Sequence, residues 1–171
     1  MTMSSVSPSK STGEFLTKRV MAYLRECGCE LAKIVVKTDQ EPAIVNLIED
    51  LTKLRVERGA GETVPENSVA GSSQSNGVVE RGVLSVEGMV RSLRSALEER
   101  IDTRLEVSDA IWPWLIEYSS YLLNRLEVGK DGKTAYERNK GKKAKVVGVE
   151  FGECVLWKRK PVGGALGKLA V

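Results

Sequence analysis

The sequence predicts an α/β fold, and three observations point to it. A short, β-branched apolar run, Leu31–Lys37, is typical of a buried strand, and it lies between two segments whose apolar residues recur at helical spacing. A second short run, Lys53–Glu57, indicates another strand after the second of those helices. A strand joined through a helix to a further strand is typical of a right-handed parallel crossover, and two more helical patterns follow it.

Each helix is predicted from its apolar stripe and from its ends. The first begins near Thr12 and stops before Gly28, and the second begins at Pro42, a residue that suits a first helical turn. The third covers about Asn76–Arg100, and the fourth about Ser108–Leu126. The stripe of the third helix alternates spacings of four and three, and it consists of Val79, Val83, Val86, Val90, Leu93 and Leu97. We expect its first three valines to pack against the strand residues 34–36.

Composition and charge divide the chain into three parts. Residues 1–11 are rich in Ser, Thr and Pro, and we expect them to be disordered. Residues 12–128 form the predicted core, in which the Gly/Ser-rich residues 59–77 read as one long loop. Residues 129–171 carry eleven basic and four acidic side chains, with strand-like alternation over Val146–Lys158. Such a basic extension is suited to a polyanion, although a solvated lysine-rich terminus has the same composition.

Missing residue types and patterns exclude several functions. The chain has no histidine, so a Cys/His zinc finger, a Ser-His-Asp triad and a Cys-His dyad are excluded. The three cysteines are too few for a disulfide framework or a four-cysteine zinc site. No stretch is long and apolar enough for a membrane span, and the first residues do not resemble a secretory signal. We therefore expect a nuclear or cytoplasmic protein whose chemistry, if any, depends on carboxylates.

Two carboxylates stand where a metal site could form. Asp39 directly follows the first strand, at the edge where open α/β sheets bind ligands. Glu80 lies in the first turn of the third helix, and the two converge if that turn packs near the strand end. Mg²⁺ takes oxygen ligands, commonly one or two carboxylates with waters and phosphates. The spacing alone also fits an Asp that caps a helix and a Glu on a helix surface.

Longer motifs resemble the catalytic core of retroelement integrases, most closely those of copia-type long-terminal-repeat retrotransposons. The resemblance rests on Lys37–Pro42 (KTDQEP), Glu66–Ser68 (ENS) and above all Ser73–Arg81 (SQSNGVVER). Further along, Trp112–Trp114 (WPW), Tyr121–Arg125 (YLLNR), Thr134–Arg138 (TAYER) and residues 141–145 are similar to the segments that follow that core. The similarity keeps this order over about residues 14–160.

The resemblance implies a function as well as a fold. Asp39 and Glu80 would be the second and third members of an Asp-Asp-Glu triad that binds Mg²⁺ or Mn²⁺ and serves strand transfer during DNA integration. The implied fold is a truncated RNase H-like core without its first three strands. Residues 1–38 contain no Asp, so the first triad member is absent. We therefore expect a fragment of a retrotransposon polyprotein that is inactive by itself. Its expected partners are the DNA ends of the element and the target DNA. Whether it forms a homo-oligomer stays open.

Other residues are candidates for DNA contact, each with a plainer alternative. The arginines on the third helix are more typical of a solvated face. A polar residue at its start suits a helix cap equally well, and the lysine cluster suits a solvated linker equally well. Leu84 stands where the family often has a basic residue one turn beyond the catalytic Glu. The candidates are Gln74, Asn76, Arg91, Arg94, Lys142, Lys143 and Lys145. A noncatalytic DNA-binding or assembly module is the alternative function, and an unrelated α/β protein with an accidental motif is the third.

Overall fold

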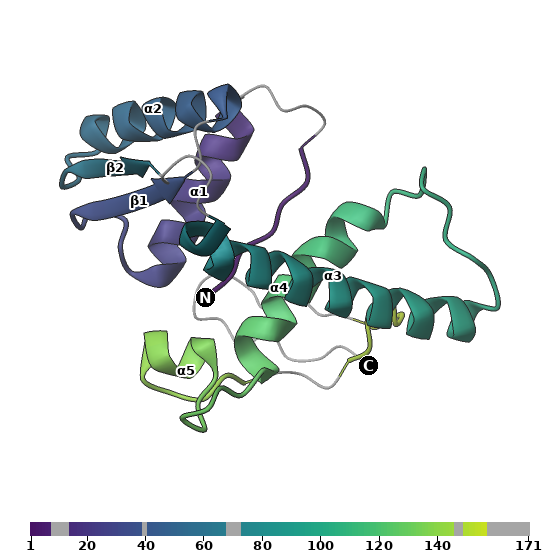
Figure 1. Ribbon diagram of the computed structural model, residues 1–171. Helices are drawn as coiled ribbons and strands as arrows, with labels where there is room; N and C mark the ends of the chain where they lie inside the picture. Colours follow the sequence, from purple (N-terminus) through teal and green to yellow (C-terminus); the bar gives the residue numbers. More distant parts are fainter. Residues whose placement is uncertain (8–13, 39–40, 68–72, 146–148, 157–171) are drawn as a thin grey trace, which may run out of the picture.

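The computed structural model describes residues 1–7, 14–38, 41–67, 73–145 and 149–156, which form a mixture of helices and strands (Figure 1). This agrees with the predicted α/β class in its coarse form. The elements in chain order are α1 (Glu14–Cys27), β1 (Ile34–Thr38), α2 (Pro42–Glu57), β2 (Thr63–Asn67), α3 (Ser73–Ile101), α4 (Trp112–Leu126) and α5 (Ala135–Lys140).

The two strands form a parallel pair connected through α2, as the strand–helix–strand order predicts. Ile34 pairs with Thr63 and Thr38 with Asn67, so both strands end at the same edge. Helix α2 packs on the pair, and α1 packs on α2 (Figure 1). The prediction of a fully buried strand is wrong, because β1 alternates half-buried and exposed residues and Val35 keeps 60% of its surface. One face of a two-stranded sheet remains open in the described chain.

The second strand lies elsewhere than the sequence suggests. Residues 53–57, predicted as a strand, are the last turn and a half of α2, and the strand is Thr63–Asn67, inside the predicted loop. The alternation of apolar and charged residues over 53–57 misled the assignment, because Leu51 and Arg55 stand one turn apart and continue the buried stripe of the helix. Pro65 is compatible with β2 because a strand at the edge of a sheet can lack one amide donor.

The main apolar core lies where α3 crosses α4. Leu97, Leu115 and Phe151 are buried there, with Val90, Leu93 and Trp112 packed around them. Phe151 belongs to the segment that the sequence assigns to a separate basic extension. That segment therefore contributes to the same core, and its described residues 149–156 form a turn and no strand. The predicted strand-like residues 146–148 and 157–158 lie outside the described part.

The N-terminal half of α3 is not packed in the predicted way. Val79 and Val83 are 65% and 51% exposed, so the expected packing of these valines against β1 is wrong. Val78 and Leu84 are exposed as well, and we call these four residues the apolar face of α3. The strand belongs to a small sheet that reaches this helix only at its edge, leaving a cavity between them.

The first seven residues also differ from the prediction of disorder for residues 1–11. They run along α4, where Thr2 and Ser4 form hydrogen bonds with Asn124 and Ser120. A segment rich in Ser and Thr tends to be disordered in isolation. Here its polar groups form hydrogen bonds with the polar face of α4, and this orders residues 1–7. Residues 8–11 lie outside the described residues.

A candidate metal and nucleic-acid site

A cavity of about 550 Å³ opens between the end of β1, the start of α2 and the first turns of α3. Glu80 lines it from α3, and Thr38 lines it from the last position of β1. The remaining lining residues are Lys37, Ile44, Val79, Val83 and Leu84. The α3 motif and the strand motif that the sequence singles out therefore open to the same cavity.

Asp39, the other expected ligand, lies outside the described residues, so its distance from Glu80 is not defined. Thr38, the residue before it, lines the same cavity as Glu80. Glu80 is exposed and forms no hydrogen bond or ion pair with the described residues, which leaves its carboxylate accessible. The described part of the chain contains no group of three or more metal-ligating side chains. A divalent ion in this cavity would therefore depend on Asp39, together with water or phosphate oxygens.

The charges around the cavity are partly balanced. Lys37 forms an ion pair with Glu66 across the two strands, with 3.3 Å between Lys37 Nζ and the carboxylate. Because this pair is exposed, it contributes little to stability and can rearrange. Of the described lining residues, an anionic ligand entering the cavity would meet Lys37 and the Glu80 carboxylate beside several apolar side chains.

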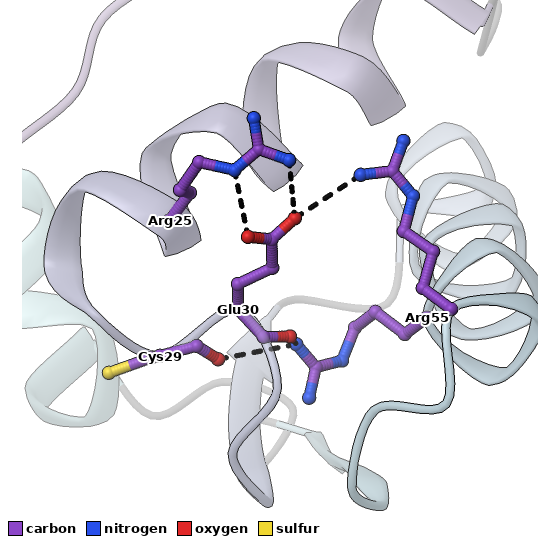
Figure 2. Close-up of polar contacts among 5 residues, drawn as sticks. Arg25, Cys29, Glu30 and Arg55 are labelled. Atoms are coloured by element: carbon purple, nitrogen blue, oxygen red, sulfur yellow. Dashed lines mark hydrogen bonds and ion pairs between the residues drawn. The ribbon is translucent and has the colours of Figure 1, made fainter.

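Arg55 holds the loops that set the position of both strands. Its side chain is completely buried and donates to the carbonyl oxygens of Glu30, Ala32 and Gly61, and to the Thr63 hydroxyl at 2.9 Å. Figure 2 shows its contact with the Cys29 carbonyl, 3.4 Å long. Backbone oxygens and the Thr63 hydroxyl thus satisfy a buried guanidinium that lacks a carboxylate partner among the described residues.

Glu30 forms a second layer of polar contacts above Arg55. It accepts two hydrogen bonds from Arg25, at 2.8 and 2.7 Å, and a third from Arg58 at 3.2 Å (Figure 2). The hydrogen bonds from Arg25, more than any other cause, hold the pKa of Glu30 below its ordinary value. Sequence reasoning missed Arg55 entirely, although its place on the apolar stripe of α2 was a signal that it is buried.

The two candidate arginines on α3 have different surroundings. Arg91 is exposed and forms a loose ion pair with Glu87 at 3.7 Å. Arg94 donates to Glu98 at 2.7 Å and lies over the Trp112 ring at 5.4 Å. Arg91 is therefore available to phosphate, whereas Arg94 would have to leave existing partners.

The lysine cluster follows α5 on an exposed segment. Lys142, Lys143 and Lys145 are all exposed, which suits phosphate contact. Helix α5 is fixed at its start by a capping box between Thr134 and Glu137. At its end, Lys140 donates to the carbonyl of Glu26 near the C-terminus of α1, where the helix dipole favours a positive charge.

The remaining candidates are less defined. Gln74 and Asn76 lie within the first turn of α3, and their side chains are outside the described part. Trp112 belongs to the core, and its indole donates to the Glu106 carbonyl at 2.7 Å, as expected for a packed tryptophan. Trp114 is 62% exposed but stacks edge-on against Phe151, and Trp157 lies outside the described residues.

A scan against protein-family models finds no match to this chain, and a search of the curated proteins finds none either. Among the described residues, no helix combines the length and hydropathy that crossing a membrane requires.

Proposed function

We propose that the chain is part of a retroelement integrase catalytic core that binds DNA and, through Asp39 and Glu80, a divalent cation. The observation that carries this proposal is the shared cavity, which Glu80 and the residue preceding Asp39 both line. Convergence of these two motifs at the carboxyl end of a parallel strand is what a carboxylate-bound Mg²⁺ or Mn²⁺ requires.

The proposed reaction of the complete core is strand transfer, in which a DNA 3′-hydroxyl attacks a phosphodiester of the target. A metal ion would there activate the hydroxyl and stabilise the leaving oxygen. Residues 1–38 contain no Asp, so the chain lacks one carboxylate of the triad that the resemblance implies. We therefore propose that this chain binds DNA and is inactive by itself.

A noncatalytic DNA-binding module is the second candidate, favoured by the apolar side chains beside Glu80 and by the exposed lysines. Cation dependence separates the two functions. We expect Mg²⁺ to strengthen binding of labelled duplex DNA, measured by fluorescence anisotropy, and Asp39→Asn and Glu80→Gln to abolish that gain. Glu87→Gln, an exposed carboxylate on the same helix, is the control. If Mg²⁺ has no effect on the unmodified chain, the noncatalytic module is the better description.

The same assay locates the DNA contact. Replacing Lys142, Lys143 and Lys145 with Ala should flatten the plot of log affinity against log salt by roughly two to three units, at about 0.9 per lost phosphate contact. A matched triple, Lys18, Lys33 and Lys53 to Ala, removes the same charge from lysines that are paired with carboxylates. An equal slope change in the two triples would mean that net charge alone, and not the cluster, governs binding.

A further inference from the structure

Helix α1 ends in a turn that carries two cysteines. Cys27 is the last residue of the helix, Gly28 has φ 80°, and Cys29 follows. The Cys29 amide donates to the Leu24 carbonyl at 2.8 Å. The Gly28 amide donates to the Arg25 carbonyl at 3.0 Å. These two hydrogen bonds, with a glycine in the left-handed region, form a Schellman motif. The local sequence therefore sets the turn that holds both thiols.

The two thiols are close enough to be joined by a small rearrangement of side chains. Two residues apart, the Cα atoms are separated by at most about 7 Å, and the turn at Gly28 shortens that distance into the range that a disulfide spans. Cys29 Sγ points back to the Cys27 carbonyl oxygen, 3.8 Å away. The Cys27 thiol lies beside the Tyr23 hydroxyl. Both cysteines are half-buried, and a thiol forms only weak hydrogen bonds, so rotation about Cα–Cβ can replace these contacts.

The same turn holds the end of α5. Asn139 Nδ2 donates to the Cys27 carbonyl oxygen at 3.0 Å, and Lys140 donates to the carbonyl oxygen of Glu26. A ring closed through the two sulfur atoms contains the carbonyl carbon of Cys27, so closure redirects the oxygen that Asn139 binds. The lysine cluster follows α5 directly. The state of the two thiols is therefore linked to the contact between α5 and α1.

We propose that Cys27 and Cys29 are a redox-sensitive pair, which a low-molecular-weight disulfide such as oxidised glutathione converts to an intrachain disulfide, and that closure releases the end of α5 from α1. One cysteine thiolate attacks the glutathione disulfide, forms a mixed disulfide and displaces one glutathione thiolate. The other cysteine thiolate then attacks the protein sulfur of the mixed disulfide and displaces the second glutathione. The two thiol protons pass to the released thiolates, so two cysteines are oxidised and one glutathione disulfide is reduced. The pair does not depend on DNA or metal binding.

Thiol labelling and mass spectrometry test the disulfide. The full-length chain carries Cys154→Ser, which removes the exposed third thiol. It is equilibrated over a series of ratios of reduced to oxidised glutathione and then labelled with excess N-ethylmaleimide in denaturant. We expect two maleimides on the reduced chain. The oxidised chain should carry neither maleimide nor glutathione and should be lighter by two hydrogen atoms.

Single-cysteine variants are the matched controls. Cys27→Ser and Cys29→Ser, each in the Cys154→Ser background, cannot close the ring and should carry one attached glutathione in the oxidising buffer. If the chain with both cysteines carries two attached glutathiones there, or keeps two free thiols in oxidised glutathione alone, the pair does not close and the proposal fails.

Hydrogen exchange tests the link to α5. We expect the amides in the last turn of α5 to exchange roughly two- to tenfold faster in the oxidised chain, as the loss of one hydrogen bond predicts. Asn139→Ala should give a similar acceleration in the reduced chain, because it removes the bond to the Cys27 carbonyl. The variant without cysteines should exchange equally in both buffers. Unchanged exchange in a chain whose disulfide is confirmed by mass would overturn the link to α5.

Discussion

The two halves of α3 carry the same apolar stripe and have opposite surroundings. In the C-terminal half, Leu97 is 4% exposed and packs with Leu115 and Phe151. In the N-terminal half, Val79 and Val83 remain mostly exposed, at 65% and 51%. The spacing of apolar residues thus defines a face of the helix, whereas the neighbouring elements decide whether that face is buried.

The charged residues of α3 follow the same division. In the packed half, Arg94 and Glu98 bond to each other and to the loop before α4. In the exposed half, Glu80 has no partner among the described residues and lines a cavity. The half with little packing is therefore the half whose carboxylate stays without a partner among the described residues.

Replacing one apolar residue by alanine in each half of α3 should give the largest difference in stability between the two halves. Leu97→Ala removes buried methyl groups from the core and should lower the free energy of unfolding by about 2–5 kcal/mol. Val79→Ala removes mostly solvated surface, so its effect should stay within about 0.5 kcal/mol. Urea unfolding of both variants measures the difference. Comparable losses would mean that the N-terminal half of α3 is packed in solution.

Alanine substitutions at two glycines should show the same contrast between the two halves, with stability changes of intermediate size. At Gly152 the backbone has φ 75°, and an added Cβ would lie 2.9 Å from Leu97 Cδ1. Gly152→Ala should therefore cost about 1–2 kcal/mol from the backbone conformation alone. At Gly82, within the exposed half of α3, an added Cβ meets nothing within 4 Å. Gly82→Ala should stabilise by about 0.5–1 kcal/mol, because glycine disfavours a helix interior. Melting temperatures that shift in the same direction would contradict this.

Local patterns were sufficient to predict the helices. Gly28 ends α1 with the predicted stop, and Pro42 starts α2. The long helix and the helix after it appear close to their predicted bounds because their apolar stripes are long. The parallel connection of two strands through α2 was predictable as well, although not the location of the second strand.

The rest depended on contacts distant in sequence. Strand β2 is a five-residue segment containing a proline, and only pairing with β1 and the bond from Thr63 to Arg55 single it out. The position of residues 1–7 depends on Asn124, more than 110 positions away. For the candidate site, the motifs single out Glu80 and the end of β1, and Glu80 and Thr38 line one cavity, whereas Asp39 lies outside the described residues. No pattern predicted that the adjoining valines would stay exposed.

Lowering the pH should also distinguish the packed half of α3 from the exposed half, and this is the smallest of the expected effects on stability. Glu98 accepts from Arg94 at 2.7 Å and from the Leu105 amide at 2.8 Å, and these bonds, the first above all, lower its pKa below the ordinary value of 4.5. Because the folded-state pKa is the lower one, ionised Glu98 stabilises the fold above about pH 4.5, and this contribution disappears as pH falls through the folded-state value. Glu98→Gln should therefore lower the free energy of unfolding at neutral pH, and this difference from the unmodified chain should disappear in acid.

Glu87→Gln is the control, because it removes only a 3.7 Å ion pair in the exposed half. Its free energy of unfolding should follow nearly the same pH dependence as that of the unmodified chain. Urea unfolding across a pH series measures both curves. If both variants show the same dependence of unfolding free energy on pH, the loop before α4 does not hold Glu98. The packed half of α3 would then end before the helical turn that carries Glu98.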